Sequence, residues 1–339
     1  MRGALDPGAG DGQTRRVMLA FLFPGQGAQY VGMGVEIAAA SPSAAACFTR
    51  ASAVLGFDLL ALCAEGPEEA LRATENTQPA ILAASCACAA ALADHGVSPD
   101  LAAGLSLGEY SALVAAGALA YEDAVALVRQ RGRFMQEAAA GRETAMAALI
   151  GLEAEAVLAL CRAHAAHGVV EPANFNGAGQ VVVGGDAAAV RAVVAAARAA
   201  GARRAVLLAV SAPFHTSLMA PAAERLASVL EQVPLRDARI PVVANVDGRP
   251  RQRAEEIRRA LIAQVASPVQ WEATMQALAH LGARTFIEVG PGTTLAGLVR
   301  KTLGVAVLNV EDLGTLERTL AALGRAAPAR SAAAGPGDG

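Results

Sequence analysis

The sequence predicts an α/β fold with a largely parallel sheet. Short apolar runs alternate along the chain with longer segments of helical periodicity, which is the pattern of strands joined by crossover helices. Hydrophobic residues make up 54% of the 339 residues, enough for a sizeable core. The polar, glycine-rich residues 1–16 and the Ala-, Pro- and Gly-rich residues 324–339 predict disordered tails on either side of the ordered part.

The individual elements follow from periodicity and length. Apolar runs bounded by turn residues predict strands at Val17–Phe23, Leu101–Gly104, Val181–Gly184, Ala205–Ala209, Val242–Asn245 and Thr285–Val289. Segments with the 3.6-residue repeat predict helices at Ala80–Asp94, Glu109–Ala116, Tyr121–Ala139, Ala187–Ala199, Ala222–Gln232 and Thr294–Thr302.

One stretch departs from simple alternation. From residue 142 to residue 209 the predicted order is strand, helix, two close strands, helix, strand, which is the order of a ferredoxin-like unit. We therefore expect a small subdomain at 142–209, inserted into a large subdomain built from 17–141 and 210–318.

Composition excludes several classes of function. The net charge is −3 and no long run of like charge occurs, so nothing indicates a nucleic-acid binder. The five cysteines form neither a CxxC pair nor a Cys/His cluster, which predicts reduced thiols, a cytoplasmic protein and no metal site. The run at 17–23 is too short to span a membrane, so we expect no membrane contact.

The strongest chemical signal is Gly104-Leu-Ser106-Leu-Gly108, which fits G-x-S-x-G. It follows a predicted strand and precedes a predicted helix, and this context distinguishes a nucleophile turn from an ordinary Gly/Ser turn. A tight strand-to-helix turn exposes the serine Oγ and directs the helix N-terminus toward it. Ser106 is therefore the predicted nucleophile.

A serine nucleophile needs a base, most often a histidine distant in sequence. His95, His164, His167 and His280 lie near helix ends or in helices, where surface or capping roles are usual. His215 instead lies in a loop between a predicted strand and a predicted helix, where α/β folds place functional groups, so it is the candidate base. The group that orients it stays open between Asp237, Asp247 and a backbone carbonyl.

Several blocks of the sequence resemble the malonyl-CoA:acyl carrier protein transacylases. They occur in the order of that family, between about residue 18 and residue 310. The blocks are Phe23-Pro-Gly-Gln-Gly-Ala-Gln29, Gly104-Leu-Ser-Leu-Gly-Glu-Tyr110, Arg129-Gln-Arg-Gly-Arg-Phe-Met-Gln136, Asn174-Phe-Asn176, Pro213-Phe-His215, Ser267-Pro-Val-Gln-Trp271 and Glu288-Val-Gly-Pro-Gly292.

The resemblance implies an α/β-hydrolase-like large subdomain and assigns roles to residues. Ser106 would be acylated with His215 as its base, and the backbone N–H groups of Gln26 and Leu107 would form the oxyanion hole. Arg131 would hold the free carboxylate of a malonyl group, since a guanidinium offers a planar fork that matches a carboxylate. The remaining residues implied at the substrate site are Gln270, whose backbone carbonyl would orient His215, and Phe214, Asn174 and Asn176.

The resemblance also implies the partners of the chain. We expect malonyl-CoA as acyl donor, an acyl carrier protein or the carrier domain of a polyketide synthase as acceptor, no cofactor beyond the coenzyme A thioester itself, and a monomer. Leu107 and Phe214 favour malonyl over methylmalonyl. Arg203, Arg204, Arg258 and Arg259 are candidates for docking an acidic carrier protein.

The chain departs from the family pattern at one position and leaves alternatives open. Leu105 stands where the family usually has a histidine, directly before the nucleophile. This replacement leaves open how the carboxylate of the acyl group is held. A carrier-protein thioester hydrolase on the same scaffold would not need Arg131, and a silent docking module would not need Ser106 and His215. The pathway stays open between fatty-acid and polyketide synthesis.

Overall fold

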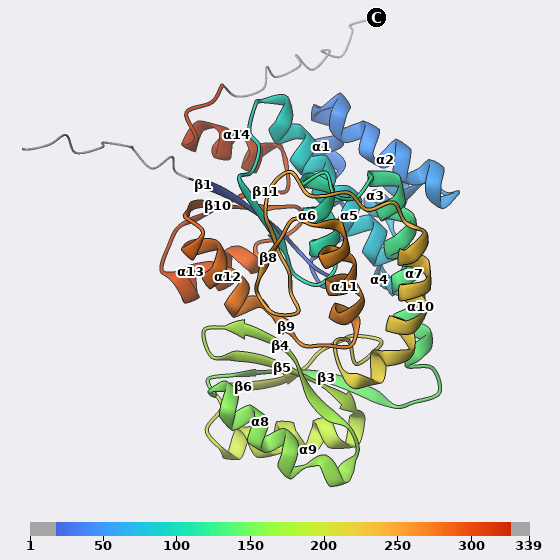
Figure 1. The fold of residues 1–339 in the computed structure, drawn as a ribbon, viewed down its shortest axis with the longest axis vertical. Helices are drawn as coiled ribbons and strands as arrows, with labels where there is room; N and C mark the ends of the chain where they lie inside the picture. Colours follow the sequence, from blue (N-terminus) through green and yellow to red (C-terminus); the bar gives the residue numbers. More distant parts are fainter. Residues whose placement is uncertain (1–17, 327–339) are drawn as a thin grey trace, which may run out of the picture.

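The computed structural model describes residues 18–326, and its strands form two sheets (Figure 1). The larger sheet is parallel except for its last strand, β8, and its order is β11-β10-β1-β2-β7-β8. Its strands are β1 (Met18–Phe23), β2 (Leu101–Gly104), β7 (Val242–Val243), β8 (Pro250–Arg251), β10 (Ala283–Val289) and β11 (Val307–Val310).

Helices cover both faces of this sheet. Alternate residues of β1 point to opposite faces, so Phe21 and Phe23 join one hydrophobic core while Ala20 and Leu22 join a second. The helices of this part are α1 (Val35–Ala40), α2 (Pro42–Leu55), α3 (Leu59–Glu65), α4 (Glu68–Arg72), α5 (Thr74–Asp94), α6 (Gly108–Ala115), α7 (Tyr121–Ala138), the 3₁₀ turn η2 (Ser217–Met219), α10 (Ala220–Gln232), α11 (Ala254–Val265), α12 (Trp271–His280), α13 (Thr294–Leu303) and α14 (Leu313–Ala322).

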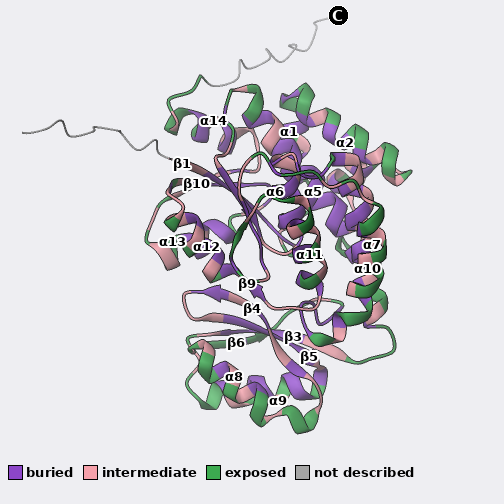
Figure 2. Cartoon of the chain, in the orientation of Figure 1, coloured by how far each residue is buried: buried purple, intermediate pink, exposed green. Residues whose placement is uncertain are grey.

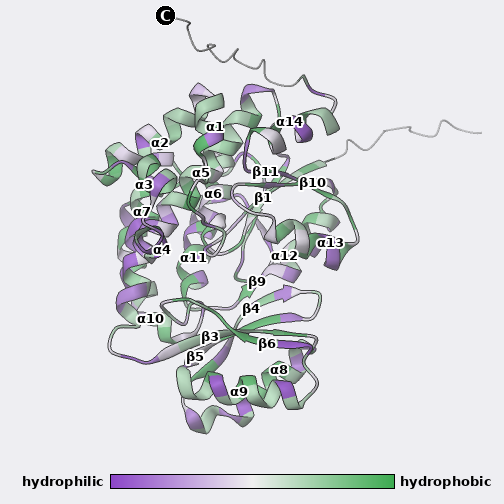
Figure 3. Ribbon diagram, turned by 180° about the vertical axis from the view of Figure 1, so that it is seen from behind, coloured by the Kyte–Doolittle hydropathy of each residue, from purple (hydrophilic) through white to green (hydrophobic). Residues whose placement is uncertain are grey.

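The two cores have different helical covers. Helices α5, α6 and α7 contribute to the core that contains Phe21, and α12 and α13 contribute to the core that contains Leu22. Buried residues follow the central strands and α5, whereas exposed residues gather on the outer helices (Figure 2). Seen from behind, hydrophobic residues follow the same inner elements (Figure 3).

The smaller sheet has the order β6-β3-β5-β4-β9 and is antiparallel except between β4 and β9. Helices α8 and α9 pack on one of its faces around a third core (Figure 1). Its elements are β3 (Thr144–Ile150), α8 (Ala154–Ala163), the 3₁₀ turn η1 (Ala165–His167), β4 (Val170–Gly177), β5 (Gln180–Asp186), α9 (Ala187–Ala199), β6 (Arg204–Leu207) and β9 (Val269–Gln270).

The two sheets are joined by packing as well as by the chain. Strand β9 comes from the segment that otherwise builds the large sheet, yet it pairs with β4 of the small one. The core that contains Phe21 also holds residues of the small sheet, among them Met146, Ala148 and Val182. The free face of the small sheet therefore lies against the larger part of the molecule.

The predicted strands and helices are confirmed, with differences at some ends. Helix α5 begins at Thr74 rather than Ala80 and carries Pro79 inside it, because packing on both sides overrides the proline signal. Strand β7 ends at Val243, since the backbone of Asn245 donates to a side chain instead of continuing the ladder. The expected tails lie outside the described residues, except for 324–326.

None of the helices in residues 18–326 is by itself long and apolar enough to cross a membrane. The pair α2 and α3 would qualify by length and composition only, with a bend of 111° between its helices. Both helices contribute buried residues to the core that contains Phe21.

Candidate active site

Ser106 lies in a tight turn between β2 and α6, as the motif predicts. Its φ of 52° is in the left-handed region, which a non-glycine residue rarely adopts outside strained functional turns. A Cβ on Gly104 would lie 1.9 Å from the carbonyl carbon of Gly108, and a Cβ on Gly108 would lie 2.1 Å from the carbonyl oxygen of Phe23. Both glycines are therefore required by the close backbone approach in this turn.

His215 meets Ser106 across a long stretch of sequence. Its Nε2 lies 2.6 Å from Ser106 Oγ, and its Nδ1 lies 2.8 Å from the backbone carbonyl of Gln264. A carbonyl only accepts, so Nδ1 carries the proton and Nε2 accepts from the serine hydroxyl. Burial, and then the charge of Arg131, lower the pKa of His215 to about 3, which leaves the ring neutral and able to act as a base at neutral pH.

The group that orients His215 differs from the one that the resemblance implies. The carbonyl of Gln264 holds Nδ1, whereas the carbonyl of Gln270 accepts from the hydroxyl of Thr274 at the start of α12. The assignment to Gln270 was therefore wrong. Neither aspartate holds the ring, because Asp237 accepts from the backbone N–H of Ala254 and Asp247 pairs with Arg251.

Arg131 brings a positive charge to the nucleophile. Its side chain is 2% exposed, and its Nη2 donates to Ser106 Oγ at 3.1 Å. Two glutamine side-chain oxygens fix the guanidinium, Gln78 at 2.9 Å from Nη1 and Gln264 at 3.0 Å from Nη2. Its Nε is buried without a hydrogen-bond partner among the described residues, and the guanidinium carbon lies 5.4 Å from the centre of the Tyr110 ring.

The loop after β1 packs against the nucleophile turn. A Cβ on Gly25 would lie 2.4 Å from the carbonyl oxygen of Leu105, so only glycine allows this approach. Within residues 18–326, the backbone N–H groups of Gln26 and Leu107 donate to no other group. Two free donors beside Ser106 are what an oxyanion hole requires, and the role of Gln26 and Leu107 stays a prediction.

The remaining predicted substrate residues are buried, and within residues 18–326 none of their side chains forms a hydrogen bond with Ser106, His215 or Arg131. Phe214 is 8% exposed and packs in the core that contains Phe21, directly before His215. Asn174 and Asn176, on β4, are also buried, and the Oδ1 atom of Asn176 has no hydrogen-bond partner in the described part of the chain. Phe175 between them packs into the third core, so both asparagines face the opposite side of the sheet, toward the large part of the molecule.

Leu105 does not take part in the arginine site. Its side chain packs against the core that contains Leu22, and its Cδ2 lies 3.3 Å from where a Cβ of Gly25 would be. Arg131 is held by Gln78, Gln264 and Ser106 without any bond to residue 105. The missing histidine therefore leaves the arginine in place.

Sequence reasoning missed four polar residues that hold the site. They are Gln78, Gln264, Asn245 and Glu109, and each is at most 2% exposed. The first three bond to the turn or to Arg131, and Glu109 accepts from Asn245 and Gln264. Asn245 Oδ1 accepts from the N–H of Ser106 at 2.5 Å, and its Nδ2 donates to the carbonyl of Gly104 at 2.7 Å. Polar residues inside otherwise apolar segments, such as Gln264 in α11, were the available signal.

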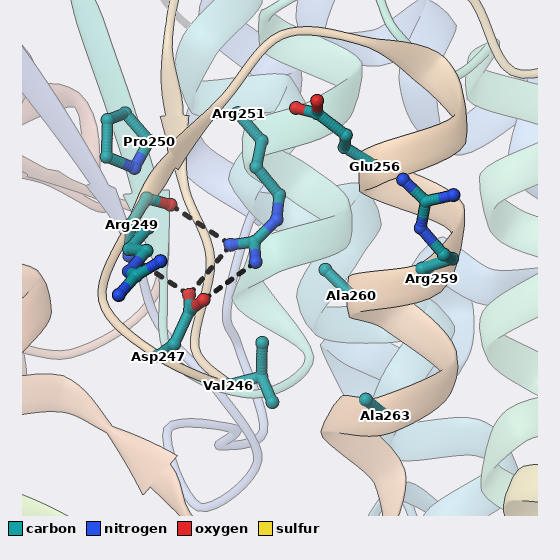
Figure 4. Close-up of a pocket in the computed structure, with 9 residues that line it drawn as sticks. All are labelled: Val246, Asp247, Arg249, Pro250, Arg251, Glu256, Arg259, Ala260 and Ala263. Carbon is teal, nitrogen blue, oxygen red and sulfur yellow. Dashed lines mark hydrogen bonds and ion pairs between the residues drawn. The ribbon is translucent and has the colours of Figure 1, made fainter.

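The surface next to Asn245 and Gln264 carries a separate pocket of about 470 Å³ (Figure 4). It lies between the β7–β8 turn and α11, and the ion pair of Arg251 with Asp247 forms one wall. None of the residues that line it is a predicted catalytic residue.

The described residues contain no group of His, Cys, Asp or Glu side chains able to hold a metal ion.

Comparison with known proteins places this geometry in context. The family model described as acyl transferase domain matches residues 20–333. A malonyl CoA-acyl carrier protein transacylase of Bacillus subtilis (strain 168) is 44% identical over 307 residues, which cover 90% of this chain and 97% of the relative.

Solved structures give the same picture. The malonyl CoA-acyl carrier protein transacylase of Coxiella burnetii is 40% identical with a TM-score of 0.88, covering 92% of this chain and 98% of that one. A malonyl-transacylase solved in complex with a type II PKS acyl-carrier protein is 44% identical with a TM-score of 0.86, covering 88% and 97%. These names agree with the family that the sequence motifs resemble.

Proposed function

The chain belongs to the acyl transferase domain family, and on that premise we propose that it transfers a malonyl group from malonyl-CoA to the thiol of an acyl carrier protein. The observation that carries the proposal is the contact of one serine oxygen with both a base and a buried guanidinium. Ser106 Oγ lies 2.6 Å from His215 Nε2 and 3.1 Å from Arg131 Nη2.

The first half-reaction loads the serine. His215 Nε2 takes the proton of Ser106 Oγ while the oxygen attacks the thioester carbonyl of malonyl-CoA. The N–H groups of Gln26 and Leu107 stabilise the oxyanion of the tetrahedral intermediate, where each donor is worth about 2.7–4 kcal/mol. The intermediate collapses, the C–S bond breaks, and the departing sulfur takes the proton from His215.

The second half-reaction runs the same steps in reverse with a new thiol. His215 takes the proton of the carrier protein's phosphopantetheine thiol, and the sulfur attacks the malonyl-serine ester. The C–O bond to Ser106 breaks, and His215 returns the proton to Oγ. Because a thioester is exchanged for a thioester, no outside energy source is needed.

Arg131 supports selection of a dicarboxylic acyl group. Its Nε has no hydrogen-bond partner among the described residues, and its other donors rest on neutral amide oxygens and on Ser106. A malonyl carboxylate supplies the counter-charge, whereas an acetyl group would leave the buried cation unpaired. Phe214 and Leu107, both buried beside the site, support malonyl over the bulkier methylmalonyl.

The finer description of the fold and its setting belongs to the same proposal. We assign 17–141 and 210–318 to an α/β-hydrolase-like large subdomain and 142–209 to a ferredoxin-like small one, supported by the strand order β6-β3-β5-β4 in the small sheet. We also infer a cytoplasmic location, supported by five free, buried cysteines, and keep a monomer as part of the proposal. The acceptor is a carrier protein of fatty-acid or polyketide synthesis, because the solved malonyl-transacylase complex holds a carrier of the latter kind.

Mass spectrometry of the carrier protein tests the proposal. The chain is incubated with malonyl-CoA and a carrier bearing phosphopantetheine, and the same carrier without that arm is the control. We expect a malonyl mass increase only on the carrier with the arm. Release of free malonate without loading would instead identify a hydrolase, and no reaction would overturn the proposal.

A further inference from the structure

Glu109 is a buried carboxylate that the mechanism does not use. It is the second residue of α6, three positions after Ser106, and its side chain is 2% exposed. Its Oε2 accepts two hydrogen bonds, from the backbone N–H of Asn245 at 3.0 Å and from Nε2 of Gln264 at 2.8 Å. Within residues 18–326 no arginine or lysine forms an ion pair with it.

The carboxylate determines which way the amide of Gln264 faces. The Nε2 of Gln264 donates to Glu109 and to the backbone carbonyl of Ser106, at 3.0 Å. Both of these oxygens only accept, so the Gln264 oxygen must face the other way, toward Arg131. There it accepts from Nη2 at 3.0 Å, and a guanidinium only donates. All four groups are satisfied in this one orientation.

Gln264 connects this carboxylate to the rest of the site. Its side chain fixes Arg131, and its backbone carbonyl holds Nδ1 of His215. The second bond of Glu109 fixes the backbone of Asn245, whose side chain binds the N–H of Ser106. One oxygen atom thus supports two residues that together contact the nucleophile, the base and the arginine.

We propose that Glu109 is a positioning residue for the dicarboxylate specificity of this site. By holding the amide of Gln264, it keeps the guanidinium of Arg131 turned toward Ser106, where the acyl carboxylate is to be bound. The inference rests on the proposed malonyl transfer. Loss of Glu109 therefore weakens selection of a charged acyl group more than it weakens acyl transfer itself.

The hydrogen bonds, and not the negative charge, carry this role. Burial raises the pKa of Glu109 to about 7, opposed by its two donors and by the charges of Arg251 and Arg131. Arg251 is already paired with Asp247, and Arg131 is reached only through Gln264. Oε2 can accept both bonds whether or not Oε1 holds a proton, so a neutral amide at this position can do the same.

Two substitutions at Glu109 separate the hydrogen bonds from the charge. Glu109→Gln keeps an oxygen for both donors and removes the charge, whereas Glu109→Leu leaves both buried donors unpaired. The matched control is Glu288→Gln, because Glu288 is also buried and also accepts two hydrogen bonds, in its case from the backbone N–H groups of Leu295 and Ala296. Folding of each variant is checked by its unfolding midpoint.

The readout is serine acylation by malonyl-CoA and by acetyl-CoA, as kcat/KM for each donor. We expect Glu109→Leu to lower the ratio of malonyl to acetyl acylation about tenfold, mainly through a higher KM for malonyl-CoA, as expected when a buried donor loses its acceptor. Glu109→Gln retains the wild-type ratio, and Glu288→Gln loses stability with the ratio unchanged.

The outcomes separate this inference from the function on which it rests. No malonyl adduct in wild type overturns the proposed function. If wild type prefers malonyl-CoA and folded Glu109→Leu has the same ratio of malonyl to acetyl acylation, only the role of Glu109 is overturned. If that variant does not fold, Glu109→Met, whose unbranched apolar side chain also lacks a strong acceptor for the two donors, repeats the test with the same criteria.

Discussion

Two turns at the same edge of the large sheet are built alike and differ in what they do. The turn from β2 into α6 and the turn from β10 toward α13 both follow parallel strands that flank β1. Each is rich in glycine, and each is flanked by a buried glutamate that accepts two hydrogen bonds, Glu109 at the start of α6 and Glu288 near the end of β10. Burial raises the pKa of both carboxyls to about 7.

The difference lies in what each glutamate holds. Glu288 accepts from the N–H groups of Leu295 and Ala296, so it caps the first turn of α13 and stabilises that helix. Glu109 accepts from Asn245 and Gln264, residues from other segments that hold a strained serine. The same buried carboxylate thus supports a helix end in one turn and a reactive geometry in the other.

The largest effect should come from removing His215, because of the two turns only the one after β2 has a base beside it. His215→Ala deprives Ser106 of its base, and we expect serine acylation by malonyl-CoA to slow roughly 10²- to 10⁴-fold. Stopped-flow or quenched-flow acylation measures the loss. An acylation rate within a few-fold of wild type would remove the functional difference between the two turns.

The next effect concerns Arg131, which contacts the serine of the first turn from α7. Arg131→Lys keeps a positive charge but cannot contact Gln78, Gln264 and Ser106 at once, as the guanidinium does. We expect malonyl acylation to fall about 10²-fold, with acetyl acylation much less affected. Steady-state kinetics with the two donors checks this, and equal losses for both would show that Arg131 has no part in selecting the acyl group.

Substitutions in the turn after β10 should change the stability of the protein. Gly290 and Gly292 both have a positive φ, of 128° and 82°, but a Cβ on Gly290 would lie 2.3 Å from Ser85 Oγ, whereas a Cβ on Gly292 meets only Ala28 Cβ at 3.8 Å. We expect Gly290→Ala to lower the free energy of unfolding by about 1–3 kcal/mol, and Gly292→Ala, the control, to cost less. Urea unfolding measures both, and equal costs would contradict the close packing inferred at Gly290.

The smallest effect is a pH dependence of the free energy of unfolding, to which both buried glutamates should contribute. Between about pH 4.5 and 7 the folded protein keeps a proton on Glu109 that the unfolded chain releases, so this group lowers stability as pH rises through that window. Glu109→Gln removes the contribution, and its stability relative to wild type should improve as pH rises. Glu288→Gln should show the same sign, which urea unfolding at several pH values tests.

Much of the fold could be predicted because local patterns decide it. The apolar run Leu101–Gly104 and the helical repeat Ala187–Ala199 match β2 and α9 residue for residue. The two-residue strand β9 could not be predicted, since only its pairing with β4 makes it a strand. The short helices α1, α3 and α4 are set by packing on α2 and α5 rather than by a long repeat, and of the three only α3 has an N-terminal side-chain cap, Asp58.

The site residues can be separated in the same way, into those that local sequence predicts and those that only the three-dimensional arrangement reveals. Ser106, His215 and Arg131 stand in recognisable blocks, and the structure brings all three together. Gln264 lies outside the motif blocks, near the end of α11, and its role depends on where a backbone carbonyl of that helix lies in space. The block that follows it points to Gln270 instead. Glu109 lies inside the block Gly104–Tyr110, but only its partners from distant segments reveal what it holds.

The central claim is that the turn after β2 carries a serine that is loaded with a malonyl group. Intact-protein mass after incubation with malonyl-CoA, for wild type and Ser106→Ala, tests this most directly. We predict one malonyl adduct on wild type, located on Ser106 by peptide mapping, and none on the variant. An adduct of equal yield on Ser106→Ala, or none on wild type, would contradict the account.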